Sequence, residues 1–84
     1  MESSIHFLAM LRERGIRREW VTLAEQEPDR VEDYEDGTRH FIKRIEDNEN
    51  RWLQVVVNVK EMPEIRVTAF FDRRLRRQDE DRRR

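Results

Sequence analysis

The 84-residue sequence predicts an α+β fold, in which two N-terminal helices pack on one face of a three- to four-stranded antiparallel sheet. Two observations lead to this prediction. Although 44% of the residues are charged, the apolar residues collect in short segments, each long enough for one helix or one strand. Their spacing is helical in the first segments and alternating in the later ones. Helices followed by sequential strands favour an antiparallel meander with one covered face and one open face.

The first helix is expected over residues 4–14. Ser3 or Ser4 can cap its N-terminus, because a serine hydroxyl accepts a hydrogen bond from a free backbone N–H. Gly15 supplies the left-handed conformation that ends many helices. The apolar residues of this segment recur at helical spacing and are Ile5, Phe7, Leu8 and Leu11.

The second helix is expected to begin at Arg17 or Arg18 and to end near Gln26, because Pro28 cannot continue a helix. Its inner stripe consists of Trp20, Leu23 and Ala24.

The strands are expected after residue 29, where the helical period ends. A weak edge strand leads to Asp36-Gly37, a pair favoured in tight hairpin turns because both residues tolerate positive φ. The next strand is expected over Thr38 to Ile45 and a turn over residues 46–50. Residues 51–60 alternate, which places one set of side chains toward the helices: Leu53, Val55, Val57 and Val59.

The last strand is expected over residues 65–71 and completes a domain of residues 1–71. Strict alternation would direct Arg66, Thr68 and Phe70 to the open face. Residues 72–84 carry seven basic and four acidic side chains, and we expect them to form a basic, mobile tail.

Composition narrows the classes of function. The sequence contains no cysteine, which excludes disulfides, thiolate metal sites and cysteine nucleophiles. No apolar run approaches the roughly 20 residues that cross a bilayer, so we expect a soluble, cytoplasmic protein without a membrane partner. His6 and His40 lie outside any metal-binding spacing, and two glycines cannot build a phosphate loop. We therefore expect no metal and no cofactor.

The open face of the sheet is where we expect a function. Aromatic and polar side chains would share this face with cations, and such a mixture can stack bases and contact phosphates. The residues concerned are Trp52, Gln54, Asn58, Arg66, Thr68 and Phe70. The pattern is equally compatible with a face that contacts another subunit through Trp52 and Phe70.

The opening HFLAMLRERGI, with His6 and Arg14-Gly15-Ile16, resembles the start of a bacterial domain family of unknown function that is grouped with the RelE, ParE and BrnT-like toxins. Residues 28–31, LQVVVNV at 53–59 and VTAFFDRRLRR at 67–77 are similar to its later segments, whereas Met10 replaces an arginine of the family pattern. The resemblance implies a sheet with two N-terminal helices. For some relatives it also implies an mRNA endonuclease, ribosome-dependent or free, that an antitoxin neutralises.

The leading hypothesis from the sequence is therefore a toxin-like module that binds RNA or the ribosome, cleaves RNA without a metal and has an antitoxin partner. His6 is the candidate acid–base residue, and Lys43 and Arg66 are candidates to stabilise the phosphate. The candidate RNA-binding residues are Trp52, Phe70, Arg44, Arg73, Arg74, Arg76 and Arg77. The alternative is a non-catalytic module that binds a protein or forms a homodimer.

Overall fold

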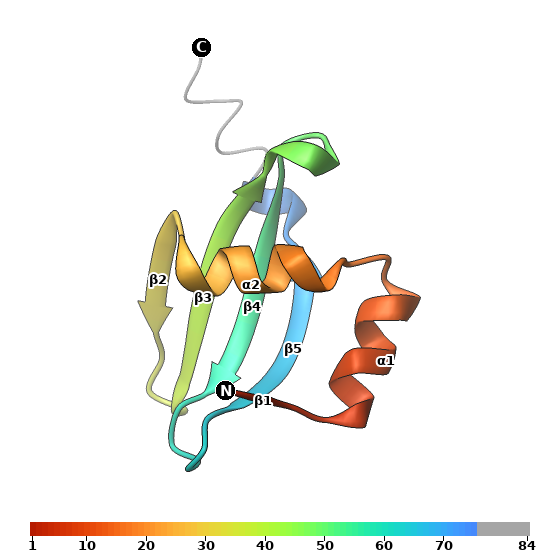
Figure 1. The fold of residues 1–84 in the computed structure, drawn as a ribbon. Helices are drawn as coiled ribbons and strands as arrows, with labels where there is room; N and C mark the ends of the chain where they lie inside the picture. The colour runs from red at the N-terminus through yellow and green to blue at the C-terminus, as the bar shows by residue number, and fades with distance from the viewer. Residues whose placement is uncertain (76–84) are drawn as a thin grey trace.

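The computed structural model describes residues 1–75 and consists of a layer of helices on a layer of sheet (Figure 1). The elements in chain order are β1 (Glu2–Ser3), α1 (Ile5–Glu13), α2 (Arg18–Gln26), β2 (Arg30–Asp33), β3 (Thr38–Ile45), the 3-10 helix η1 (Glu46–Asn48), β4 (Arg51–Asn58) and β5 (Ile65–Phe71). Residues 73–75 add a short helical turn. The predicted α+β class, with two helices before the main strands, is confirmed.

The sheet has five strands in the order β1-β5-β4-β3-β2. β1 runs parallel to β5, whereas every other neighbouring pair is antiparallel. The prediction of a purely antiparallel sheet with three or four strands is therefore wrong. The missed strand β1 has only two residues and no apolar alternation. Its position depends on a distant part of the chain, because the Glu2 N–H donates to the Glu64 carbonyl at 2.8 Å.

Both ends of α1 form as the sequence predicts. The Ser4 hydroxyl accepts a hydrogen bond from the Phe7 N–H at 3.0 Å. At the other end Gly15 has a φ of 66°, and the Ile16 N–H donates to the Leu11 carbonyl at 2.8 Å. This closure turns Ile16 into the core.

Within residues 1–75, no helix has the length and apolar content that a membrane span requires.

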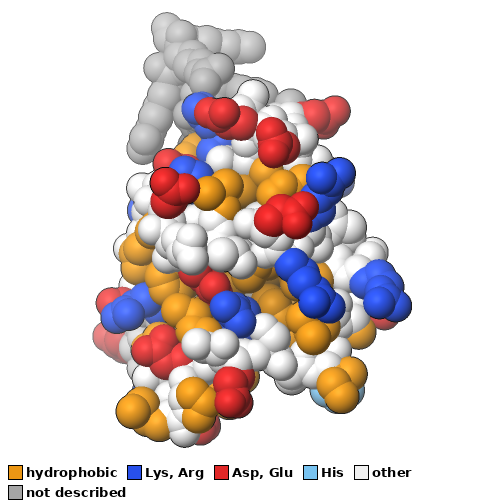
Figure 2. Space-filling model, viewed as in Figure 1, with side chains coloured by type: hydrophobic (Ala, Val, Ile, Leu, Met, Phe, Trp, Pro, Cys, Tyr) orange, Lys and Arg blue, Asp and Glu red, His pale blue; other side chains and the backbone are white. Residues whose placement is uncertain are grey.

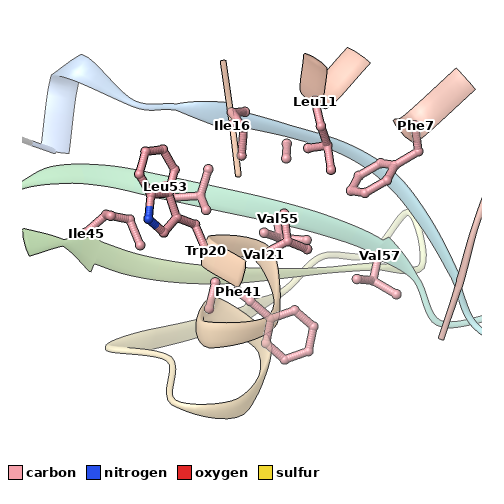
Figure 3. Packing of buried hydrophobic residues seen from close by; sticks show 12 residues of the cluster. Phe7, Leu11, Ile16, Trp20, Val21, Phe41, Ile45, Leu53, Val55 and Val57 are labelled. Atoms are coloured by element: carbon pink, nitrogen blue, oxygen red, sulfur yellow. The ribbon is translucent and has the colours of Figure 1, made fainter. Parts of the chain in front are cut away.

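The core lies between the helices and one face of the sheet (Figure 3). α2 packs across β3 and β4, and α1 packs against β5. Leu53, Val55 and Val57 of β4 are fully buried beneath the helices, which confirms the predicted inward face for these three residues. Trp20 and Val21 of α2 lie over them.

The hairpin between β2 and β3 turns at Asp36-Gly37 as predicted. Gly37 has a φ of 88°, which a residue with a side chain adopts only under strain. The Asp36 carboxylate accepts hydrogen bonds from the Thr38 hydroxyl at 2.6 Å and the Thr38 N–H at 3.0 Å, and these bonds lower the pKa of Asp36. The turn therefore fixes where β3 begins.

A β-bulge interrupts the alternation of β5. Thr68 and Arg66 pair with consecutive residues of β4, so Val67 is the extra residue and is 51% exposed. Arg66 consequently lies on the helix face, where its guanidinium is 2.6 Å from the Glu25 carboxylate. The prediction that Arg66 lies on the open face is wrong, because the extra residue puts the side-chain alternation before it out of step with the alternation after it, so Arg66 and Thr68 lie on opposite faces.

Arg14 ties the end of α1 to the outer edge of β5. Its guanidinium donates to the Ala69 carbonyl at 2.7 Å and to the Thr68 hydroxyl at 3.2 Å. In the described part of the chain, β1 pairs with β5 only at Ile65 and Arg66. Arg14 thus provides a donor for a backbone carbonyl at the edge that β1 does not reach, which is a structural role for the arginine of the Arg-Gly-Ile sequence.

Candidate functional site

The face of the sheet opposite α1 and α2, here called the open face, carries a row of hydrogen-bonded polar side chains. His40 Nδ1 of β3 lies 2.9 Å from Gln54 Oε1 of β4, and Gln54 Nε2 lies 2.7 Å from Asp72 Oδ2. The backbone N–H of Arg74 donates to Asp72 Oδ1 at 2.9 Å, and its guanidinium does so at 3.3 Å. These four residues are called the His40 relay below.

The relay determines which nitrogen of the His40 ring carries a proton. An ionised carboxylate only accepts hydrogen bonds, so the amide nitrogen of Gln54 faces Asp72 and its oxygen faces His40. Because that oxygen also only accepts, Nδ1 of His40 must be the donor. In the neutral imidazole Nε2 then holds the lone pair, and no residue among 1–75 hydrogen-bonds to it. His40 therefore offers a proton acceptor of fixed orientation.

Asp72 anchors the relay. Its N–H donates to the Trp52 carbonyl at 2.8 Å, which extends the pairing with β4 beyond the end of β5. The residue is 8% exposed. Burial alone would raise the pKa of its carboxyl, but hydrogen bonds from Arg74 and Gln54 outweigh that effect and lower the pKa below its ordinary value. Asp72 is consequently ionised at neutral pH, as the orientation of Gln54 requires.

Tyr34 lies beside the His40 ring, with 4.3 Å between the ring centroids. Its hydroxyl donates to the Glu32 carboxylate at 3.2 Å, and this bond raises the pKa of Tyr34. Arg74 is near enough for its charge to oppose that rise. Residues 72–74 therefore lie on the open face beside β4, where Asp72 contacts Gln54, and the charge of Arg74 extends to Tyr34.

The site thus combines a proton acceptor, a protonated hydroxyl and a cation. The acceptor is Nε2 of His40, the hydroxyl belongs to Tyr34, and the cation is the Arg74 guanidinium, whose side chain is 84% exposed. These are the group types that acid–base chemistry on a phosphodiester needs. Within residues 1–75 no three His, Asp or Glu side chains are grouped so that they could hold a metal ion.

The family described as "Domain of unknown function (DUF4258)" matches residues 4–71, which extend from the N-cap of α1 to the end of β5. The chain belongs to the DUF4258 family. The match establishes no connection to the RelE, ParE or BrnT-like toxins. Neither the comparison with curated proteins nor the comparison with solved structures gives a match. The matched region contains Tyr34, His40 and Gln54 and ends one residue before Asp72.

The three catalytic candidates predicted from the sequence do not form one cluster in this DUF4258 domain. His6 is exposed in the first turn of α1. Lys43 lies on the helix face, 3.5 Å from Asp29, and Arg66 is held by Glu25. In the described residues, no hydrogen bond or ion pair joins any two of these three candidates.

Three of the candidate RNA-binding residues lie on the open face. Arg44 pairs with Trp52 and Phe70 pairs with Gln54, so all of them share the open face of this DUF4258 domain. The indole N–H of Trp52 is buried without an acceptor among residues 1–75. Arg73 is exposed at the start of the last turn.

The remaining candidates belong to the segment after residue 71, which we expected to be a mobile tail. Asp72 and Arg74 instead form part of the relay and belong to the folded unit. Arg76 and Arg77 lie outside the described residues.

Sequence reasoning missed the relay itself. Gln54 is the signal in the sequence that could have indicated it, because it interrupts the apolar run of β4. In the structure Gln54 is only 7% exposed. A buried amide needs hydrogen-bond partners, and the neighbour of Gln54 on β3, Ile42, is two residues from His40 and on the same face of the sheet. Asp72 could not have been identified in this way, because its burial depends on the path of the chain after β5.

Proposed function

We propose that this protein binds RNA across the open face and cleaves it, with His40 as the proton acceptor in place of His6. The His40 relay carries the proposal. Three partners in series orient one imidazole, and the row ends at a nitrogen to which no described residue bonds. Such an arrangement supports acid–base catalysis more directly than an exposed helix residue does. The resemblance to toxin-like RNA endonucleases supports the choice of RNA as substrate.

In the proposed reaction Nε2 of His40 takes the proton from a ribose 2′-hydroxyl. The 2′ oxygen forms a bond to the adjacent phosphorus while the bond from phosphorus to the 5′ oxygen breaks. The products are a 2′,3′-cyclic phosphate and a 5′-hydroxyl. Tyr34 supplies the proton to the leaving oxygen, because its hydroxyl is protonated at neutral pH and its ring lies beside that of His40. The proton on His40 then restores Tyr34 through solvent.

Charge and stacking complete the proposal. Negative charge builds on the phosphate oxygens as the new bond forms, and the exposed guanidinium of Arg74 can neutralise it. Tyr34 is 48% exposed and Phe70 is half-buried on the same face, so both present ring surface for bases. Base–aromatic stacking contributes about 1–3 kcal/mol per base.

The test is cleavage of a labelled single-stranded RNA and of ribosome-bound mRNA, both in the presence of EDTA. We expect products with a 2′,3′-cyclic phosphate and no cleavage where the scissile nucleotide carries 2′-deoxyribose. His40→Ala should reduce the rate by about 10²- to 10⁴-fold, the range typical for a general base. His6→Ala is the matched control and should cleave like the wild type.

A toxin-like role predicts in addition that production of the wild type slows growth, whereas production of His40→Ala does not. If the wild type cleaves neither substrate, or if both histidine variants lose activity equally, the proposal is wrong.

A further inference from the structure

The two helices diverge over the sheet, because α1 packs on β5 whereas α2 packs on β3 and β4 (Figure 1). Side chains of α1, α2 and β5 line two adjoining hollows. One hollow of about 430 Å³ lies along α1, and a second of about 220 Å³ continues it toward β5. The two hollows share Leu8, Leu11 and Arg18. We call the combined surface the interhelix groove, and its lining on the helices includes Ile5, Leu8, Ala9, Leu11, Arg12 and Arg18.

The groove exposes apolar side chains of α1 in addition to those that α1 buries in the core. Phe7 and Leu11 already form the buried stripe of α1. A second stripe runs beside it through Ile5, which is 84% exposed, Leu8, which is half-buried, and the exposed Ala9. Figure 2 shows apolar surface gathered between the helices, with Lys and Arg side chains around it. A nine-residue helix with two apolar stripes has one stripe left for a partner.

Two cations line the groove, Arg12 in the hollow along α1 and Arg18 where the two hollows meet. Arg12 lies in the last turn of α1, and Arg18 is the first residue of α2. No ion pair engages either guanidinium within residues 1–75, whereas Arg66 in the second hollow is held by Glu25. An apolar groove with two uncompensated cations at its rim is complementary to a segment that combines apolar and acidic side chains.

We propose that the interhelix groove docks an amphipathic helix of a partner protein, in which aspartate or glutamate flanks the apolar residues. The apolar side chains enter between α1 and α2, and the carboxylates meet Arg12 and Arg18. The groove lies on the helix side of the sheet, away from the His40 relay, so this inference goes beyond the proposed cleavage reaction and does not depend on it.

The probe is a short fluorescein-labelled helical peptide with leucines three and four residues apart and glutamates on either side of them. A second peptide has lysine in place of every glutamate. Fluorescence anisotropy should show that the glutamate peptide binds the wild type more tightly than the lysine peptide does. Ile5→Glu should weaken binding of the glutamate peptide by about tenfold or more, which is the effect of losing one good contact.

Charge reversal is the sharper variant. Arg12→Glu should weaken binding of the glutamate peptide and strengthen binding of the lysine peptide, which a folding defect would not do. Two matched controls should bind as the wild type does. Met62→Glu changes a 91% exposed apolar residue outside the groove, and Arg73→Glu reverses an exposed charge after β5.

Three results would overturn the proposal. The first is no binding of the glutamate peptide to the wild type, and the second is equal binding by Ile5→Glu and Met62→Glu. The third is a wild-type dimer in light scattering that Ile5→Glu converts to a monomer, because a second copy of the chain would then occupy the groove. His40→Ala should bind the peptide normally, so loss of RNA cleavage and loss of docking remain distinguishable.

Discussion

Two charged clusters of this DUF4258 domain differ in whether all their hydrogen-bonding groups have partners among the described residues. On the helix face, the Arg66 guanidinium donates to both oxygens of Glu25 at 2.6 Å and also to the Ser3 hydroxyl and the Met1 carbonyl. On the open face, the relay from Arg74 to His40 stops at Nε2, to which no described residue bonds. The first cluster is closed on itself and fastens β1 and α2 to β5. The second leaves Nε2 of His40 available to accept a hydrogen bond from a substrate.

Charge type alone does not identify a functional residue. Arg66 satisfied every requirement that the sequence could impose on a phosphate-binding arginine, yet its donors are engaged by Glu25 and the N-terminal segment. His40 was the less prominent histidine in the sequence, and its partners distinguish it from His6. Whether every polar group in a cluster has a partner within the protein is a property of the fold. The roles of the two clusters can be tested by breaking each of them in turn.

Among the variants that keep His40, the largest effect is expected from breaking the relay at its centre with Gln54→Leu, which keeps the volume and removes the amide. His40 then loses the acceptor that fixes its tautomer, and RNA cleavage should fall by about 10- to 100-fold, as when the orienting partner of a functional histidine is removed elsewhere. The ¹⁵N shifts of the imidazole should change from one dominant tautomer to a mixture. An unchanged tautomer with reduced cleavage would show that the relay does not orient His40.

Breaking the closed cluster should change stability and leave catalysis intact. Glu25→Ala leaves the Arg66 side chain, which is 20% exposed, without its carboxylate. We expect a loss of about 2 kcal/mol in the free energy of unfolding, below the range for fully buried pairs because some water reaches the arginine. Glu25→Gln keeps one acceptor and should cost less. Urea unfolding measures both effects.

The matched control for this pair is Arg17→Ala. Arg17 and Glu19 are 3.8 Å apart and both about 70% exposed, and the Arg17 guanidinium also lies 5.4 Å from the centre of the Trp20 ring. Arg17→Ala should therefore cost no more than about 1 kcal/mol, less than Glu25→Ala costs. Equal losses in Glu25→Ala and Arg17→Ala, or a loss of RNA cleavage in Glu25→Ala, would contradict the assignment of the Glu25 cluster to stability alone.

The sequence predicted most of the fold because its signals were local. The Ser4 cap, the Gly15 stop and the Asp36-Gly37 turn each act within a few residues, and all three are where the pattern placed them. The bulge at Val67 depends on how β5 meets β4, and a two-residue strand such as β1 has no period to detect. Alternation across β5 was therefore the step at which the sequence-based reasoning failed, and it misplaced Arg66.

The candidate site was only half predictable for a related reason. The open face and two of its aromatic residues, Trp52 and Phe70, follow from alternation in β4 and β5, whereas the face that Arg44 occupies depends on how β3 pairs with β4. The relay requires that the chain after the last strand place Asp72 against Gln54 on the open face, and no local sequence pattern specifies that path. A residue placed in a tail by composition thus became the anchor of the site.

The smallest effect concerns the protonation of that anchor. The pKa of Asp72 in the folded protein lies below its ordinary value, which is about 3.9 in an unfolded chain. The carboxylate is therefore favoured by folding. Asp72 adds to stability above about pH 4, and this contribution is lost as the pH falls through the lower pKa of the folded state.

The difference in unfolding free energy between the wild type and Asp72→Asn should consequently be largest near neutral pH and should shrink as the pH falls from about 4 toward 2. Arg74→Ala retains the backbone N–H bond to Asp72 and loses only the guanidinium bonds, so it should remove part of this pH-dependent difference. Urea unfolding at several pH values measures both. A difference between wild type and Asp72→Asn that stays constant from neutral pH to pH 2 would mean that the ionised carboxylate does not hold the relay, and the proton on Nδ1 of His40 would lose its explanation.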